Sequence, residues 1–169
     1  MIEIRKEEPR DCKAVHYLNM AAFNDGPEAA LVDRLRTSCK DYLAFVATEN
    51  GFVIGHILFT PVSVDDCHKP GMGLAPMAVL PSHQGRGVGS QLVRHGLEFL
   101  RKARCPFVIV LGHPGYYPRF GFEPASKYQL VSQWEGVPDE AFMVAAFDPS
   151  ALPGAGGVAR YLDEFDDAM

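Results

Sequence analysis

The hydrophobic and polar positions along the chain predict strands and helices in mixed order. Residues 2–5 alternate between apolar and polar side chains, as a short strand does. An early proline and apolar residues at helical spacing predict a helix over 9–23. The turn residues of 24–27 separate it from a second predicted helix over 28–37. The chain is therefore expected to open with one strand and two helices.

The clearest hairpin lies in the next segment. Two apolar runs, 42–48 and 52–64, flank a turn that contains Asn50-Gly51, the strongest short hairpin signal. A further strand is predicted to begin at Gly73. Pro76 within that strand weakens its pairing, because proline has no N–H to donate.

The second half of the chain continues in the same mixed order. A helix is predicted over 91–102, where apolar residues recur at helical spacing and basic residues complement the C-terminal dipole. The run 106–112 is continuously apolar, which is typical of a central strand buried on both faces. The segments 128–131 and 142–147 are predicted to be the closing strands. The glycines, prolines and like charges of 148–169 predict a tail that is loosely held or contains a short helix.

Composition and length predict one globular domain. The chain has 169 residues, of which 47% are hydrophobic and 22% are charged, enough to bury a core. We expect the domain to span 1–147, with 148–169 as a C-terminal extension. A formal net charge of −5 argues against nucleic acid as the main partner, because binding a phosphate backbone needs clustered Lys and Arg.

The cysteines and the termini bear on where the protein works. The four cysteines form no C-x-x-C pair, so they predict reduced thiols and no metal site. No signal peptide and no membrane span is recognisable in the sequence. The expected location is the cytoplasm.

A glycine-rich turn at 84–90 is the most informative stretch of the sequence. Gly85, Gly87 and Gly89 let the backbone approach a ligand closely. The turn opens a helix whose first N–H groups have no acceptor one turn earlier. These groups and the positive end of the helix dipole predict an anion site, most simply for phosphate. Arg86 can add a charge-assisted contact to such an anion.

Spacing separates this turn from two familiar phosphate-binding motifs. It lacks the lysine of a P-loop, and its third glycine is misplaced for the dinucleotide fingerprint. The turn resembles the pyrophosphate loop of the GNAT superfamily of acyl-CoA-dependent N-acetyltransferases, whose pattern Gln/Arg-x-x-Gly-x-Gly/Ala is met by Gln84, Gly87 and Gly89. The family's apolar-x-Val-x-Pro strand before the loop is present as Met77-Ala-Val79-Leu-Pro81.

The resemblance covers about residues 2–147 and implies both a fold and a reaction. The implied fold is α/β (α+β): a mixed, mostly antiparallel sheet of six to seven strands, with helices on both faces and a splayed central strand pair that admits pantetheine. The implied reaction transfers an acetyl group from acetyl-CoA to a primary amine by direct attack in a ternary complex. The implied acceptor is a small-molecule amine or a protein amino group, with no membrane partner and no metal. A homodimer and a longer acyl chain are left open.

In the family pattern, backbone groups hold much of the cofactor. The Met77 N–H faces the thioester oxygen and acts as a catalytic donor, and the Val79 backbone pairs with pantetheine. A single preorganised donor is worth about 3 kcal/mol to an oxyanion transition state. The residues expected to bind acetyl-CoA are Met77, Val79, Gln84, Gly85, Arg86, Gly87, Val88, Gly89, Ser90, His113 and Tyr117.

A second motif implies the catalytic acid. The segment 113–122 resembles the family's short helix with Phe/Tyr-Tyr-x-x-x-Gly-Phe, and Tyr117 falls on its tyrosine. A phenol holds its proton at neutral pH and can give it to the leaving thiolate. Tyr116 is the alternative acid, and packing is the alternative role for both tyrosines. His113 lies near the place of a common family asparagine, where it could contact pantetheine, relay a proton or cap the loop.

The base that takes the amine proton is not identified by the sequence. Many family members carry a glutamate on the strand before the loop, but residues 73–80 contain no acidic side chain. Water, Glu28, His56, His113 or an amine that is already neutral remain as alternatives. Asp25 and Glu28 could also face a cationic acceptor, although a turn role and a helix-dipole role explain them more simply.

Two other kinds of protein compete with the acetyltransferase hypothesis. A non-catalytic acyl-CoA-binding module would keep the anchor loop but need no acid, and Tyr117 argues against it. A nucleotide-dependent enzyme is disfavoured by the glycine spacing and by the absence of the P-loop lysine.

Overall fold

The chain folds as two units, and the computed structural model describes all 169 residues. Unit 1 contains Met1–Phe59, Pro76–Gly96 and Asp163–Met169. Unit 2 contains Thr60–Ala75 and Leu97–Leu162. Two strands and one helix contribute residues to both, and each unit is described by itself.

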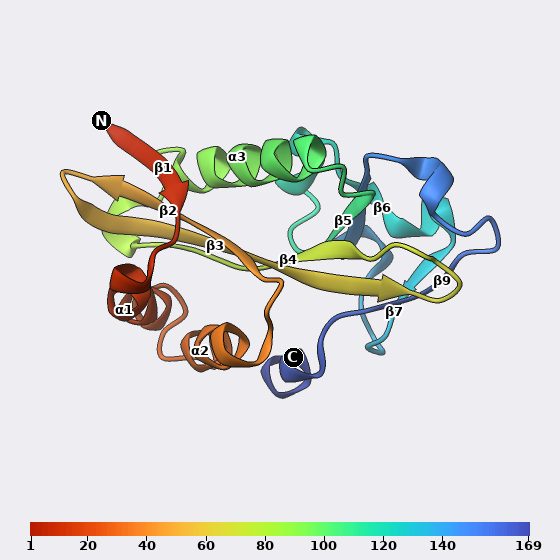
Figure 1. The fold of residues 1–169 in the computed structure, drawn as a ribbon, viewed down its shortest axis with the longest axis horizontal. Helices are drawn as coiled ribbons and strands as arrows, with labels where there is room; N and C mark the ends of the chain where they lie inside the picture. Colours follow the sequence, from red (N-terminus) through yellow and green to blue (C-terminus); the bar gives the residue numbers. More distant parts are fainter. The chain divides into compact units, whose positions relative to one another are not determined.

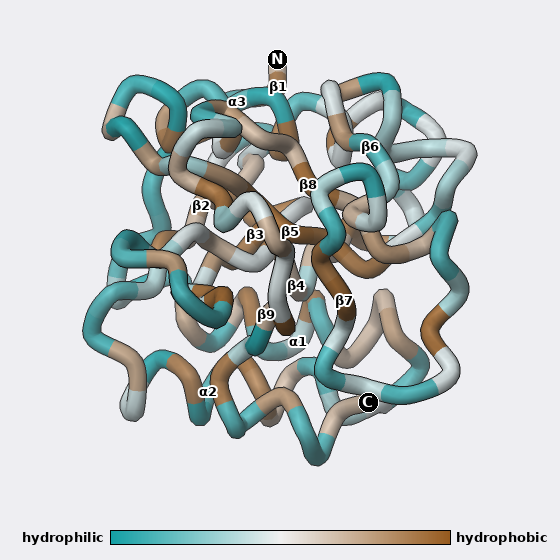
Figure 2. Tube along the Cα trace, turned by 90° about the vertical axis from the view of Figure 1, so that its right-hand side faces the viewer, coloured by the Kyte–Doolittle hydropathy of each residue, from teal (hydrophilic) through white to brown (hydrophobic).

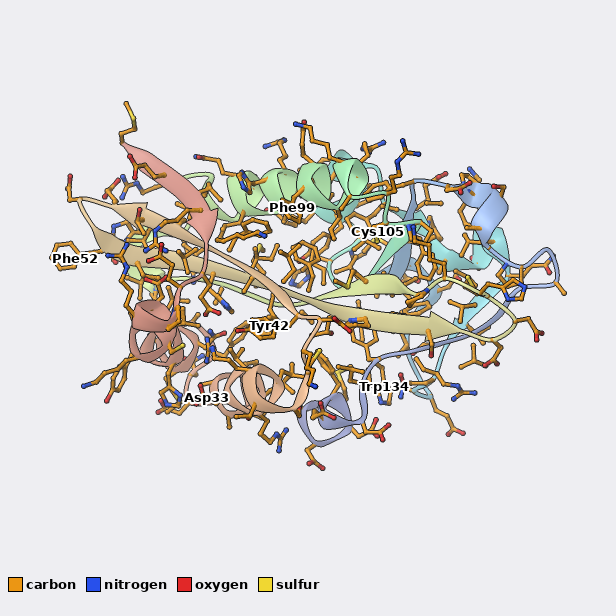
Figure 3. The ribbon with its side chains drawn as sticks, in the orientation of Figure 1. Asp33, Tyr42, Phe52, Phe99, Cys105 and Trp134 are labelled. Carbon is orange, nitrogen blue, oxygen red and sulfur yellow. The ribbon has the colours of Figure 1, made fainter.

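Antiparallel strands form the sheet of unit 1. Strand β1 (Ile2–Lys6) pairs with β2 (Leu43–Glu49), which pairs with β3 (Phe52–Val64). The structure confirms the predicted hairpin: Asn50 and Gly51 have φ angles of 53° and 82°, and a type I′ turn requires two such positive values. Phe52 projects from the tip of this hairpin and is exposed (Figure 3).

Helices cover both faces of the unit 1 sheet, as predicted. The short 3₁₀ helix η1 (Pro9–Asp11) leads into α1 (Cys12–Ala22), and α2 (Glu28–Ser38) follows. These helices lie on one face of the strands and the first part of α3 (Val88–Lys102) lies on the other (Figure 1). Gly55 on β3 makes the approach of α3 possible, because a Cβ there would lie 2.9 Å from the Leu92 side chain.

Unit 2 is built on a second set of strands. Their hydrogen-bonded order is β4 (Gly71–Val79), β5 (Phe107–Leu111), β8 (Phe142–Ala146) and β6 (Glu123–Pro124). The β5–β8 and β8–β6 pairs are antiparallel. Residues along β5 and β8 are strongly hydrophobic (Figure 2). Phe107 to Val110 are buried, as the continuous apolar run predicts.

The two central strands pair over a short distance only. Strand β4 runs parallel to β5, and the pairing joins Met72–Leu74 with Val108–Val110. Two residues further along β4, Pro76 has no N–H with which to extend a ladder. The pairing therefore ends at Leu74, as expected for the predicted splay.

The end of the chain differs from the sequence-based expectation. Strand β7 (Leu130–Ser132) does not close the sheet beside β8 but pairs in parallel with β9 (Gly157–Arg160). Strand β9 also pairs with Ser63 and Val64 of β3. Tyr161, which follows β9, is buried. Strand pairing therefore holds this part of the tail, and Ala159 and Tyr161, two positions apart, are buried despite the glycines before them.

The last residues of the chain also pack, within unit 1. Asp163–Ala168 form the 3₁₀ helix η7, in which Phe165 is buried. Arg34 and Ser38 of α2 donate hydrogen bonds to the carbonyl and side chain of Glu164, at 3.1 and 2.8 Å. The sequence left open a short helix over 158–165, but the structure has a strand over Gly157–Arg160 and the 3₁₀ helix only from Asp163. The domain boundary at residue 147 stays a prediction.

The remaining elements are short. Besides those already named, the 3₁₀ helices are η2 (Pro81–His83), η3 (Tyr117–Phe120), η4 (Ala125–Tyr128), η5 (Asp139–Ala141) and η6 (Pro149–Ala151). All four cysteines are free thiols. No helix of the structure combines the length and the apolar character that crossing a membrane requires.

A buried polar cluster connects Glu7, which follows β1, with β3 and α2 in unit 1. Arg36 donates a hydrogen bond to Glu7 at 2.5 Å, and both side chains are largely buried. Nε2 of His56 lies 3.5 Å from the same carboxylate, but neither ring nitrogen has a hydrogen-bond partner. Burial lowers the pKa of His56 to about 3; Arg36 adds to the lowering and Asp11 opposes it. His56 is therefore neutral at physiological pH.

This buried histidine predicts a loss of stability in mild acid. The unfolded chain takes up a proton at His56 below about pH 6.5 and the folded chain does not, so stability falls as the pH drops from 6.5 towards 3. Between pH 7 and pH 5 we expect this residue to cost about 2 kcal/mol of unfolding free energy. Urea unfolding of the wild type and His56→Leu at both pH values measures it. The variant should lose about 2 kcal/mol less than the wild type, and equal losses would contradict the prediction.

Candidate active site

The predicted phosphate loop lies in unit 1, between the end of β4 and the start of α3. Leu80 follows β4, and its N–H donates to the Ile54 carbonyl at 2.9 Å. After η2, Gly85 and Gly87 have φ angles of 77° and 82°, a conformation that glycine adopts without strain. A Cβ on either glycine would meet no atom within 4 Å. The backbone of this loop is therefore open to a ligand.

A hydrogen bond from Gln84 links the loop to β4. Its Nε2 donates a hydrogen bond to the Val79 carbonyl at 3.0 Å. The structure thus brings together two residues of the predicted cofactor site, one at the end of the strand and one at the start of the loop. Met77 lies two residues before Val79, and both side chains are half-buried.

The first turn of α3 favours an anion. Val88, Gly89 and Ser90 form this turn, with Gly87 immediately before the helix, and no acidic residue lies in it. The Gln91 N–H already donates to the Gly87 carbonyl at 3.1 Å, which closes the first helical bond. The N–H groups of the first turn point along the helix axis towards its positive end. This arrangement fits a phosphate, as the sequence predicts.

Arg86 is held beside the loop by an acidic partner. Its Nη2 lies 3.1 Å from Oε2 of Glu49, and Nε2 of His83 lies 3.4 Å from the other oxygen of this carboxylate. The Arg86 side chain is about half exposed. Sequence reasoning missed Glu49, which stood out only as the residue before the Asn-Gly turn. A phosphate contact by Arg86 would thus share the guanidinium with Glu49.

Tyr117, the predicted acid, lies in unit 2 in a setting of aromatic rings. Its ring packs so closely on Gly112 that a Cβ on this glycine would overlap it. It makes edge contacts with Tyr116, Phe120 and Phe122, with ring centroids 5.0, 6.3 and 5.6 Å away. The side chain is buried, whereas Tyr116 is partly exposed.

The surroundings of Tyr117 set its acidity. Burial raises the pKa of this phenol to about 12, and Tyr116 adds to the rise. Tyr117 therefore keeps its proton throughout the physiological range. A phenol of this pKa is a weaker acid than a free one, but burial also penalises the charge of a thiolate beside it.

His113 contributes its backbone rather than its ring to the segment around Tyr117. Its carbonyl accepts hydrogen bonds from the N–H groups of Tyr116 and Tyr117, at 3.0 and 3.3 Å. The side chain is exposed. These backbone bonds cap the turn that leads into η3, and a pantetheine contact or a proton relay by the ring stays a prediction.

Tyr161 is a residue in unit 2 that sequence reasoning missed. Its ring lies over Gly73 of β4, and its hydroxyl donates to the Ile109 carbonyl of β5 at 3.2 Å. The only signal in the sequence was an aromatic residue in a tail rich in glycine. Trp134, from the loop after β7 (Figure 3), packs against it. Their ring centroids are 5.4 Å apart.

The acidic residues named for the acceptor lie around the α1–α2 turn of unit 1. Asp25 has a positive φ of 60°, and its N–H donates to the Met20 carbonyl, which supports the turn role. Glu28 begins α2, and its Oε2 is buried without a hydrogen-bond partner beside Gly26. His56, the third candidate, is fully buried.

A cavity of about 620 Å³ lies elsewhere in unit 1. It is lined by β1, η1 and the β2–β3 turn, including Arg5, Asp11 and Phe52. None of the residues predicted to bind the cofactor lines it. The cavity is therefore separate from the residues of the phosphate loop.

Known proteins with similar sequences are named N-acetyltransferases. The family model of the acetyltransferase (GNAT) family matches residues 12–122. An uncharacterized N-acetyltransferase of Escherichia coli K12, YhbS, is 37% identical over 164 residues, which cover 96% of this chain and 98% of YhbS. A second, YjhQ, is 42% identical over 120 residues, which cover 69% of this chain and 66% of YjhQ.

Solved structures agree with this assignment. The structure of Escherichia coli YhbS in complex with CoA matches with a TM-score of 0.91 at 37% identity, covering 98% of this chain and 92% of that one. A GNAT family acetyltransferase from Brucella melitensis in complex with acetyl-CoA matches with a TM-score of 0.82 at 36% identity, covering 98% and 99%. This chain belongs to the GNAT family of acetyltransferases and is an acyltransferase.

Proposed function

We propose that the protein transfers an acetyl group from acetyl-CoA to a primary amine. The observation that carries this proposal is the loop before α3. Its two positive-φ glycines, the Gln84–Val79 hydrogen bond and the first turn of the helix make an arrangement suited to a phosphate. Relatives crystallised with CoA or acetyl-CoA support the same donor for this chain.

The proposed reaction needs no acyl-enzyme. The amine nitrogen attacks the thioester carbonyl carbon, and the Met77 N–H donates to the oxygen that becomes negative. When the C–S bond breaks, the sulfur takes the proton of Tyr117, which recovers a proton from solvent. The former amine gives up one proton and leaves as the N-acetyl product, and CoA leaves as the thiol.

The proton of the amine is proposed to leave through water. Strand β4 has no acidic residue between Gly73 and Leu80, and His56 is buried and has a pKa of about 3. A histidine with this pKa is too weak a base to accept the amine proton at neutral pH.

Calorimetric titration tests the proposal directly. We expect acetyl-CoA to bind the wild-type protein in the micromolar range, and thiol release to follow when an acceptor is present. The acceptor panel should contain small primary amines and peptides with free amino groups. Thiol release with one of these classes would name the acceptor. Binding without release on the whole panel would favour a CoA-binding module, and an absence of binding would overturn the proposal.

A further inference from the structure

Tyr161 connects strands β4 and β5 of unit 2, one residue pair before their pairing ends. Its ring occupies the space that Gly73 leaves on β4: a Cβ on this glycine would lie 2.5 Å from Tyr161 Cε2 and 2.7 Å from Val62. Its hydroxyl reaches across to β5 and donates to the Ile109 carbonyl at 3.2 Å. Gly73 and Ile109 face each other in the ladder, one pair before its last pair.

The fold holds Tyr161 in place from its other side. Oε1 of Gln133 accepts a hydrogen bond from its backbone N–H at 2.5 Å. Trp134 packs against the ring, and only 5% of Tyr161 is exposed. A side chain fixed at its backbone, ring and hydroxyl transmits its position to the strands that it contacts.

Two tyrosine rings in this region pack on glycines, one in β4 and one directly after β5. Tyr161 lies on Gly73 of β4, and Tyr117 lies on Gly112, directly after β5. The two phenols are close enough to interact electrostatically, and burial and this interaction raise the pKa of Tyr161 above its ordinary value. The Tyr161 hydroxyl is therefore a neutral donor. It binds β5 at Ile109, three residues before Gly112, on which the Tyr117 ring packs.

We propose that Tyr161 is a positioning residue for acetyl transfer, which fixes the end of the β4–β5 pairing and through β5 the placement of Tyr117. This inference rests on the proposed function, and it adds to it a residue from the C-terminal end of the chain. Tyr161 moves no proton in the reaction. It acts through the Ile109 carbonyl and through the ring that fills the space over Gly73.

The variant Tyr161→Phe tests the inference, because it removes the hydroxyl and keeps the ring. We expect kcat to fall about 10-fold, since a small misplacement of a catalytic group slows chemistry strongly. The Kd for acetyl-CoA should stay within two-fold of the wild type, because the ring that fills the space over Gly73 is kept. The matched control is Tyr128→Phe, the same chemical change at a half-exposed tyrosine of unit 2, which should leave kcat and Kd unchanged.

The outcomes separate this inference from the proposed function. If the wild type binds and turns over acetyl-CoA but Tyr161→Phe keeps kcat within two-fold, the inference alone is overturned. If acetyl-CoA affinity and melting temperature fall together with kcat, Tyr161 is merely structural and the inference is again overturned. If the wild type itself neither binds acetyl-CoA nor releases thiol, the proposed function fails and the inference falls with it.

Discussion

Replacing Gly87 with glutamate should raise the Kd for acetyl-CoA at least about 100-fold. Gly87 has a φ of 82°, which costs a residue with a Cβ about 1–2 kcal/mol, and the loop loses its fit to the ligand. The larger effect is electrostatic, because a carboxylate then stands where the pyrophosphate is proposed to bind. Calorimetric titration of acetyl-CoA into wild type and variant measures this loss, which at 100-fold equals about 2.7 kcal/mol.

The chain contains a matched control for this variant. Gly51, in the β2–β3 turn, has the same φ of 82° and equally open space around its Cα. Gly51→Glu therefore introduces the same backbone strain and the same charge at a place with no proposed ligand. It should bind acetyl-CoA as the wild type does and melt at a similar temperature to Gly87→Glu. If Gly87→Glu still bound acetyl-CoA within three-fold of wild type, the pyrophosphate would bind elsewhere than at the loop of residues 84–90.

Local chemistry explains which parts of the fold were predictable. The Asn50-Gly51 turn and the helix of α3 depend on residues that are neighbours in sequence, so their patterns predict them directly. The phosphate loop is of the same kind, because its glycines and its helix start are contiguous. Strand β5 was predictable because burial on both faces leaves a continuous apolar run.

Long-range packing explains what the sequence did not reveal. The tail has the composition of a loose segment, yet β9 finds pairing partners on β3 and β7, more than 20 residues away in the chain. No local pattern encodes such partners. Tyr161 was missed for the same reason, because its role depends on the missing side chain of Gly73 on a distant strand.

His56 illustrates how structure narrows chemistry that sequence leaves open. In an apolar strand, a histidine is more often a structural or pocket-lining residue than a catalytic base, but the sequence alone leaves both roles open. Its complete burial, and a pKa of about 3, place it among the core residues of unit 1. The charge pair of Glu7 and Arg36 beside it then contributes to the fold, and the list of candidate bases becomes shorter.

Replacing Tyr117 with phenylalanine should lower kcat about 100-fold, the smaller end of the range for general acid catalysis. The variant keeps the ring over Gly112 and its contacts with Phe120 and Phe122, so the fold and acetyl-CoA affinity should change little. In the wild type the acid form persists up to high pH, because burial raises the pKa of Tyr117 to about 12. The activity of the wild type should therefore show no loss from this group until the pH passes about 11.

Tyr116→Phe is the control for this measurement, since it removes a hydroxyl from the adjacent residue. Its kcat should stay within about three-fold of the wild type. Tyr116 is partly exposed, whereas Tyr117, the proposed acid, is the buried one of the two. Steady-state thiol release with the acceptor found above gives both values. The opposite result, with Tyr116→Phe slow and Tyr117→Phe active, would assign the acid to Tyr116. Equal activity of both variants and the wild type would mean that solvent protonates the thiolate and that both rings only pack.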